Sequence, residues 1–144
     1  MNGEFCVAVH ALVYLNHKAS TQSSEALAEN ICTHPARVRK VMAKLKKAGL
    51  VDTREGSEGG YRFTLDPAEV SLRQIGEALD TRFVAAAWHS GDSDMDCLIA
   101  SGMADIMDDI CGQLDDLCRE RMGRVTIRDI DRRIFTGADN ETPA

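Results

Sequence analysis

This sequence of 144 residues lacks the patterns of three features: a secretory signal peptide, a membrane span and a disulfide framework. Each absence excludes a class of protein. The apolar start, MNGEFCVAVHALVYL, has no basic lead-in and no small-residue cleavage pattern, so we expect no secretory signal peptide. No apolar run reaches the length of a membrane span. The five cysteines are an odd number at irregular spacing, which indicates reduced thiols rather than a disulfide framework. We therefore expect a cytoplasmic protein with no membrane partner.

Net positive charge is also lacking, because the formal charge is −6, and this argues at first against a polyanionic partner. The average hides two regions of opposite sign. Residues 1–66 hold nine Lys and Arg against seven Asp and Glu, and residues 67–144 hold eight against sixteen. Six of the nine positive residues lie between Arg37 and Lys47, where there is no acidic residue. The length suits one domain with an appendage, and its first half carries the cationic surface.

The first fifty residues are typical of three helices. Residues 3–18 are too densely apolar for a surface helix, so we expect a helix that is buried on more than one side. The segment TQSSEALAEN supplies Ser or Thr as an N-cap and predicts a short helix over about 24–30. Pro35 then opens a third helix, which ends at Gly49. Two helices joined by a short turn, the second one basic, predict a helix-turn-helix unit.

In the rest of the chain the spacing of apolar residues changes several times, which indicates different elements. Alternating apolar residues on both sides of REGSEGGYRF predict a two-stranded hairpin, and the next apolar face predicts a helix over about 72–79. Residues 81–97 are expected to be an irregular loop region that includes the polar loop HSGDSDMD, and a long amphipathic helix follows over about 98–122. We expect no fixed structure in the tail at 132–144.

The third helix presents two different faces. Val38, Val41, Met42 and Leu45 fall in one arc of about 100 degrees, which we expect to face the core. The opposite face has alanines at its centre and long cations at both edges, as a helix in a major groove requires. A solvated lysine-rich helix is the alternative for this helix alone, but the neighbouring turn and hairpin favour DNA. The candidate DNA-binding residues of the two helices are Ser24 in the second and Pro35, Ala36, Arg37, Arg39, Lys40 and Lys44 in the third, with Lys46 and Lys47 at the phosphate margin.

The glycine-rich turn REGSEGGYRF has three interpretations. A phosphate-binding loop would need a helix and a Lys-Ser or Lys-Thr pair after the glycines, whereas GGYRF leads into a strand. A wing would place Arg54 beside the minor groove, and Gly59 and Gly60 would let the tip approach it closely. A plain hairpin turn is the alternative, and Glu55 and Glu58 count against uniform attraction to phosphate. We favour the wing.

The long helix carries an apolar stripe in an arc of about 80 degrees, while its aspartates, Asp115 among them, are expected to face solvent. Packing within one subunit is one interpretation. We favour pairing with a second copy, which would set two recognition helices about one DNA turn apart. The candidate dimerisation residues are Ile99, Met103, Ile106, Ile110, Leu114 and Leu117.

The polar loop contains the candidate sensor residues Cys97 and His89. Acidic neighbours would raise the pKa of the Cys97 thiol and make it less reactive, and Trp88 and His89 could instead line a small-ligand pocket. A thiol enzyme would need an orienting group and an oxyanion motif beside this pair, and neither accompanies it, so we expect no enzyme. The other cysteines are expected to pack as small apolar residues: Cys6, Cys32, Cys111 and Cys118.

Over about residues 5–131 the sequence resembles the BadM/Rrf-two type of bacterial winged-helix transcription regulators. The matching segments are VAVHALVYL, SSEALAENI, PARVRKVMAKLKKAGLVDTREGSEGGYRFTLDP, VSLRQIGEALD and RVTIRDID. The resemblance implies a homodimeric repressor or activator that reads a roughly palindromic site in double-stranded DNA with its third helix and wing.

Several members of this family carry an iron-sulfur cluster on three cysteines in the loop before the long helix. Here only Cys97 lies between Phe83 and Ala100, and Cys111 and Cys118 lie well inside the helix. Three thiolates cannot converge from these positions without unwinding the helix. We therefore expect no cluster and no metal, as in the cluster-free members.

The sequence thus predicts a mainly α fold with a small β-hairpin, in which a winged helix-turn-helix domain precedes a long C-terminal dimerisation helix. The expected function is that of a homodimeric regulator of transcription, a repressor that responds to a redox, nitrosative or small-molecule signal. A winged-helix module that binds an acidic protein partner is the alternative. The expected parts are a DNA-binding domain at 1–80, a loop and sensor region at 81–97, a dimerisation helix and following segment at 98–131, and the tail at 132–144.

Overall fold

The computed structural model describes residues 2–136. In chain order the elements are α1 (Gly3–Lys18), α2 (Ser24–Ile31), α3 (Pro35–Lys47), β1 (Asp52–Arg54), β2 (Gly60–Arg62), α4 (Leu72–Ala78), α5 (Leu98–Met122) and α6 (Ile127–Phe135). The predicted fold class, mainly helical with one antiparallel hairpin and a long C-terminal helix, is confirmed.

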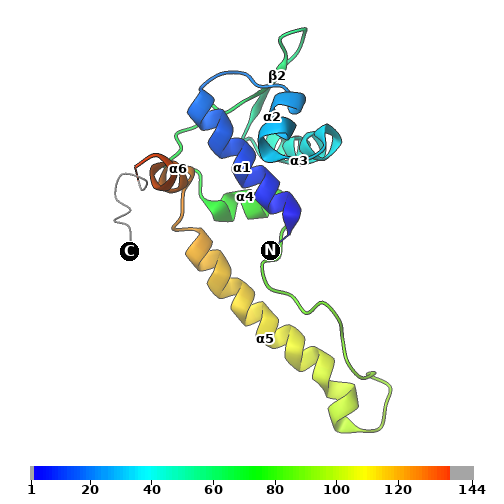
Figure 1. Cartoon of the computed structure of the whole chain (residues 1–144). Helices are drawn as coiled ribbons and strands as arrows, with labels where there is room; N and C mark the ends of the chain where they lie inside the picture. Colours follow the sequence, from blue (N-terminus) through cyan, green and yellow to red (C-terminus); the bar gives the residue numbers. More distant parts are fainter. Residues whose placement is uncertain (1, 137–144) are drawn as a thin grey trace, which may run out of the picture.

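Two regions differ in shape. The head, residues 2–83 and 123–136, gathers α1 to α4, the hairpin and α6 into one body. The arm, residues 84–122, consists of α5 and the irregular segment before it, and it projects away from the head (Figure 1). At 25 residues, α5 is about 37 Å long. No helix within residues 2–136 combines the length and the apolar character needed to cross a membrane.

The core of the head is built around α1, which contacts α2, α3, α4 and α6. Leu12 and Leu15 on α1 have no exposed surface, and neither do Val38 and Leu45 on α3. Full burial of such a side chain contributes about 1.5–3 kcal/mol. The predicted core face of α3 is therefore confirmed, as is the burial of α1 on more than one side.

Local capping explains where the two helices of the helix-turn-helix begin. The hydroxyl of Ser23 accepts a hydrogen bond from the backbone N–H of Ala26 at 3.1 Å, which starts α2. The ring Nδ1 of His34 accepts one from the N–H of Ala36 at 3.1 Å, and Pro35 occupies the first helical turn of α3.

Helix α6 corrects the expectation that residues 132–144 form an unstructured tail. Thr126 and Asp129 exchange backbone-to-side-chain hydrogen bonds of 2.9 and 3.2 Å, a capping box that starts the helix. Ile127 is completely buried in the head, and Phe135 stacks on His17 with 4.2 Å between ring centroids. These contacts hold the segment in helical form as far as Phe135. Residues 137–144 lie outside the described residues.

Helix α6 also packs into the head, although the DNA-binding domain was expected to end at residue 80. The hydrophobic core of the head includes Phe83 and Ile127, which both lie beyond that position. The chain leaves the head after Phe83, runs through the arm, and returns to the head at α6 (Figure 1).

Candidate nucleic-acid interface

The hairpin is fastened to the helix-turn-helix by a third extended segment. Within the hairpin, Asp52 of β1 pairs with Arg62 of β2, and Arg54 pairs with Gly60. Gln22, just before α2, exchanges two backbone hydrogen bonds of 2.8 and 2.9 Å with Tyr61. Gly60 has φ +153, and a methyl group there would collide with the backbone of Gln22, so only glycine fits.

One group of predicted residues gathers where α2 meets the hairpin. Ser24, Arg54, Gly59 and Gly60 line one recess of about 370 Å³. Ser24 is only 9% exposed, and its hydroxyl accepts a hydrogen bond from Arg39 at 3.3 Å. Ser24 therefore supports Arg39 from below the surface, and Arg39 is the member of this pair that can reach DNA.

Acidic residues already occupy part of this edge. Arg39 also forms an ion pair with Glu25 at 3.6 Å, and both side chains are more than half exposed. Burial raises the pKa of the nearby Tyr61 hydroxyl, while the positive charge of Arg39 opposes that shift. Exposed pairs of this kind are weak and readily exchange partners.

A second group of predicted residues lies at the opposite edge of α3, against the start of α1. Glu4 pairs with Lys40 at 2.9 Å and with Lys44 at 3.1 Å. Hydrogen bonds from these two lysines lower the pKa of the Glu4 carboxyl. The guanidinium of Arg37 lies against Gly3 on the same side.

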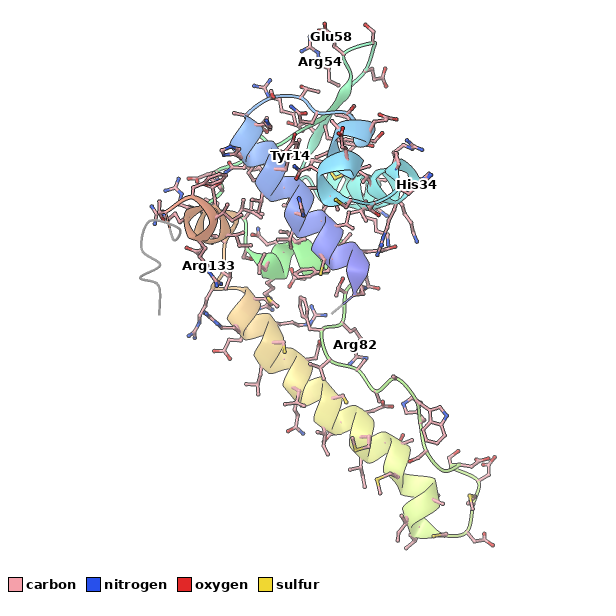
Figure 2. All side chains as sticks on the ribbon, in the orientation of Figure 1. Tyr14, His34, Arg54, Glu58, Arg82 and Arg133 are labelled. Atoms are coloured by element: carbon pink, nitrogen blue, oxygen red, sulfur yellow. The ribbon has the colours of Figure 1, made fainter. Side chains whose placement is uncertain are left out.

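Other cations remain free of protein partners. Within residues 2–136, no hydrogen bond or ion pair involves the side chains of Lys46, Lys47, Arg54 and Arg62. Arg54 lies with Glu58 at the end of the molecule opposite the arm (Figure 2). A methyl group at Gly59 would collide with the Arg54 carbonyl oxygen, so glycine here keeps the tip narrow.

The arrangement is therefore an exposed ridge at Ala36 and Ala43 with cations along both edges. One edge continues into the hairpin, and the other into α1. Free cations are available at once to bind phosphate, and the paired ones become available when an acid releases them. This arrangement can bind a nucleic-acid backbone on both sides of an inserted helix.

The apolar stripe predicted on α5 is uncovered. We call its six residues, Ile99, Met103, Ile106, Ile110, Leu114 and Leu117, the α5 stripe. Ile99 is 72% exposed and Leu117 is 62% exposed, and only Met103 is half-buried. Packing of this stripe within one chain, the alternative interpretation, is not seen.

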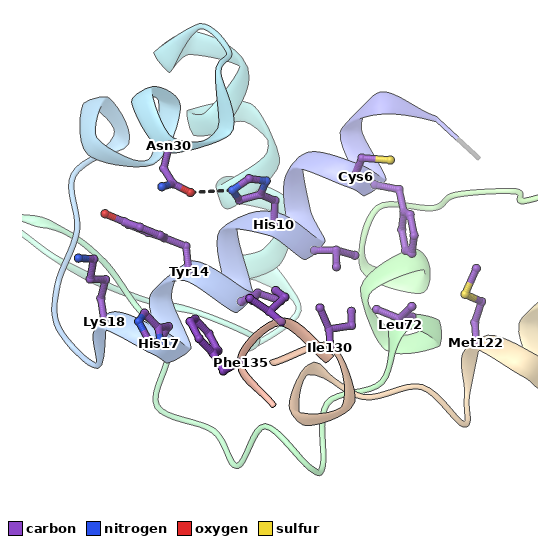
Figure 3. Close-up of a pocket in the computed structure, with 14 residues that line it drawn as sticks. Cys6, His10, Tyr14, His17, Lys18, Asn30, Leu72, Met122, Ile130 and Phe135 are labelled. Carbon is purple, nitrogen blue, oxygen red and sulfur yellow. Dashed lines mark hydrogen bonds between the residues drawn. The ribbon is translucent and has the colours of Figure 1, made fainter. Parts of the chain in front are cut away.

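A second apolar surface lies in the head and was not predicted from the sequence. It is a groove of about 650 Å³ between α1 and α6 (Figure 3), which we call the α1–α6 groove. A hydrogen bond of 2.7 Å joins His10 and Asn30 at its rim. Its lining residues include Val9, Val13, Leu72, Met122, Ile130 and Phe135. The apolar residues on the outer face of α1 were a sequence signal for this groove. They could be assigned to it only once the position of α6 was known.

The expectation that Asp115 faces solvent is wrong. Asp115 is 4% exposed and accepts backbone hydrogen bonds from Phe83 at 2.6 Å and Val84 at 2.9 Å. Arg119, one helical turn later, donates to it at 2.9 Å. Desolvation opposes ionisation of Asp115, but these donors outweigh it and lower its pKa. No periodicity within α5 reveals this, because the partners come from the preceding segment.

The two candidate sensor residues, Cys97 and His89, contact different groups. Cys97 is the N-cap of α5 and its side chain makes no capping hydrogen bond, but the nearby backbone N–H groups of Ala100 and Ile99 lower the pKa of its thiol, contrary to the expected rise. His89 instead pairs with Asp108 at 2.8 Å. Trp88 is 79% exposed and does not line the α1–α6 groove.

Two cysteines also differ from expectation, because Cys6 and Cys32 are exposed rather than packed. Cys32 has a left-handed φ of 61 at the C-cap of α2, which turns it away from the core. Cys6 lies on the outer face of α1, in the lining of the α1–α6 groove. Cys118 does pack partly against the core.

Comparison with known proteins identifies relatives along nearly the whole chain. The sequence model of the Rrf2 family, described as "Iron-dependent Transcriptional regulator", matches residues 1–133. YwnA of Bacillus subtilis (strain 168), whose name describes an HTH-type transcriptional regulator, is 24% identical over 135 residues, which cover 94% of this chain and 99% of YwnA.

Solved structures share the fold. A transcriptional regulator structure from Lactobacillus plantarum has a TM-score of 0.79 at 22% identity, covering 99% of both chains. T. potens IscR has a TM-score of 0.67 at 17% identity, covering 100% of this chain and 91% of its own. The winged-helix architecture and the long C-terminal helix are therefore shared with these regulators.

The iron in the family description can be tested against the residues present. Cys97 and Cys111 are separated by fourteen residues of helix, or about 21 Å along the axis. Cys6 and Cys32 lie on other helices or their ends. No group of three His, Cys, Asp or Glu residues in the described chain is arranged to hold a metal ion. The residues do not fit a cluster held by three thiolates.

Proposed function

Because the chain belongs to the Rrf2 family of transcriptional regulators, and is therefore not an enzyme, we propose that it is a homodimeric, sequence-specific repressor that binds DNA. The observation that carries this proposal is the exposed alanine ridge of α3 with cations along both edges. The helix enters the major groove, and Arg54 on the hairpin follows the adjacent minor groove. Such a protein acts in the cytoplasm, where bacterial DNA is found.

The dimer is supported by two apolar surfaces that a single chain leaves open. The α5 stripe and the α1–α6 groove are both exposed in one copy, and a second copy supplies the surfaces that cover them. Twofold symmetry makes the operator roughly palindromic, with the two α3 helices about 34 Å apart. The free energy gained by covering these surfaces holds the two DNA-reading heads together.

The signal is proposed to act in the arm. Cys97 is exposed at the start of α5, and its lowered thiol pKa increases the thiolate fraction that oxidants and nitric oxide donors attack. Replacement of Cys97 by Ser should then abolish operator release by these reagents, while replacement of Cys32, which is also exposed, should not. Retention of the response in Cys97→Ser would leave a small molecule as the signal. We propose that no iron-sulfur cluster takes part.

A second candidate function has one observation in its favour. Lys40, Lys44 and Arg39 already bind carboxylates of the same chain, so this face could dock an acidic protein instead of DNA. The hairpin would then act as a protein-binding element. Such a module would bind no duplex in preference to random DNA.

Selection of duplexes from a random pool, followed by fluorescence anisotropy, tests the two candidates. We expect a palindromic site, with affinity falling about 100-fold or more between 50 and 200 mM salt. Arg39→Ala should weaken binding, and Arg73→Ala should not, because Arg73 is an exposed cation on α4 that pairs with Glu77. Recovery of no preferred duplex, or binding that is insensitive to salt, would support the protein-binding module. A reporter placed behind the site distinguishes repression from activation.

A further inference from the structure

The buried carboxylate of Asp115 joins α5 to the segment 81–84, where the chain passes from the head into the arm. Asp115 accepts the N–H groups of Phe83 and Val84 with one oxygen and binds Arg119 Nε with the other. Arg119 also donates from Nη2 to the Thr81 carbonyl oxygen at 2.9 Å. We call these five residues the joint. It connects the arm to the segment by which the chain leaves the head.

The joint is locked into the core of the head through Phe83. The Phe83 ring packs edge-on against Phe5 of α1, with 5.2 Å between centroids. Its other neighbours are the Arg119 guanidinium, 5.8 Å from the ring centroid, and Gly76 of α4, where a methyl group would lie 2.6 Å from the ring. Arg119 therefore holds both the carboxylate and the ring.

The joint also lies near one end of α5. Cys118 and Met122, the other α5 residues that pack against the core, are close to it in sequence and less directional in their contacts. The residues from Leu98 to Leu114 extend beyond it, away from the head (Figure 1). Apolar contacts tolerate small rotations, whereas hydrogen bonds weaken steeply when their angles change. The direction of the arm thus depends chiefly on the polar contacts of Asp115 and Arg119.

We propose that Asp115 and Arg119 are positioning residues that fix the direction of the arm relative to the head, and that this direction sets the half-site spacing accepted by the dimer. The inference rests on the proposed function, in which the arms pair and the heads read DNA. A rotation of about 10 degrees about Asp115 displaces the far end of α5, about 25 Å away, by about 4 Å, more than one base-pair step. A loosened joint therefore admits operators of the wrong spacing.

The test uses the full-length dimer and operators whose half-sites are moved together or apart by one or two base pairs. We expect the wild type to prefer one spacing by about tenfold or more. Asp115→Asn removes the charge that binds Arg119 and should reduce this preference to about threefold or less. Asp116→Asn, a change at the exposed neighbouring position, should keep it. A merely structural role for Asp115 would lower affinity for every spacing equally and leave the ratio unchanged.

Arg119→Lys is the second variant, because it keeps the positive charge and loses the fork that reaches Thr81. Hydrogen exchange at the amides of Phe83 and Val84 reports the joint without DNA and should become faster in both variants. A dimeric variant with faster exchange and an undiminished spacing preference overturns the inference. If the wild type itself shows no spacing preference, the proposed reading of two half-sites fails first. If Asp115→Asn does not fold, Arg119→Lys decides by the same criteria.

Discussion

In the head, Leu12 and Leu45 have no exposed surface, whereas Leu117 in the arm keeps 62% of its surface exposed. The head completes its hydrophobic core within one chain, because α1 is surrounded by other helices. The arm offers one long helix with too few neighbours to cover its apolar side. The same apolar residue types therefore serve folding in the head and are available for assembly in the arm.

For charged residues the difference between the two regions is the opposite: the paired acids Glu4 and Glu25 of the head lie at the surface, whereas Asp115 of the arm is buried. In the head, Glu4 and Glu25 pair with cations at the surface, where phosphate can replace them. In the arm, Asp115 has 6% of its side chain exposed and is bound on both oxygens. The ion pairs of Glu4 and Glu25 in the head are thus exchangeable, whereas the Asp115–Arg119 pair in the arm is fixed.

The largest expected effect follows from placing a charge on the α5 stripe. Ile110→Asp should convert the dimer to monomers, because a carboxylate would have to be buried without a partner. Operator affinity should fall by about 100-fold or more, since the second head no longer binds as part of the same molecule. Sedimentation velocity and fluorescence anisotropy measure the two quantities.

Circular dichroism should show that the head keeps its helices in Ile110→Asp. The control is Asp116→Asn, on a different side of α5, which should remain dimeric. A dimeric Ile110→Asp variant with normal affinity would remove the α5 stripe from the interface and direct attention to the α1–α6 groove.

The fold of the head was largely predictable, because its signals are local. Dense apolar residues on α1, the N-cap region before α2 and Pro35 at α3 each act within a few positions. Helix α6 also had local signals, in the Thr126 and Asp129 capping box and the spacing of its isoleucines, but they were assigned to the end of a segment and not to a helix.

The second expected effect tests whether the hairpin is a wing. Arg54→Ala should weaken operator binding about tenfold, because a free guanidinium is lost from the minor groove. Arg73→Ala is the matched control, as its exposed side chain already pairs with Glu77. Unchanged affinity in Arg54→Ala at physiological salt would reduce the hairpin to a turn.

The DNA-facing residues were predictable as a set, but their pairing was not. A helical wheel places Lys40 and Lys44 near one edge of α3, yet it cannot show that Glu4, forty positions earlier than Lys44, lies against them. The buried Asp115 was misplaced for the same reason, since its partners Phe83 and Val84 lie about thirty positions away. Contacts between distant segments decide both cases.

The smallest expected effect has the opposite sign and concerns Glu4. Glu4→Gln should release Lys40 and Lys44 and raise affinity for random duplex DNA about threefold, with the salt dependence steeper by about one to two in slope. Glu29→Gln, an exposed acid on α2 without a charged partner, is the control. A loss of affinity would mean that Glu4 holds the lysines in position for DNA.

The pH dependence of folding gives an independent measure of the same contact. The pKa of Glu4 lies below its ordinary value of 4.5 in the folded chain, because Lys40 and Lys44 bind the carboxylate. The stabilisation is therefore complete above pH 4.5 and is lost as the pH falls through the lowered pKa. Glu4→Gln should flatten this acid limb in thermal unfolding between about pH 5 and pH 3. The Asp115 pair contributes to the same limb, so only the difference between wild type and Glu4→Gln isolates the exchangeable contact in the head from the fixed one in the arm.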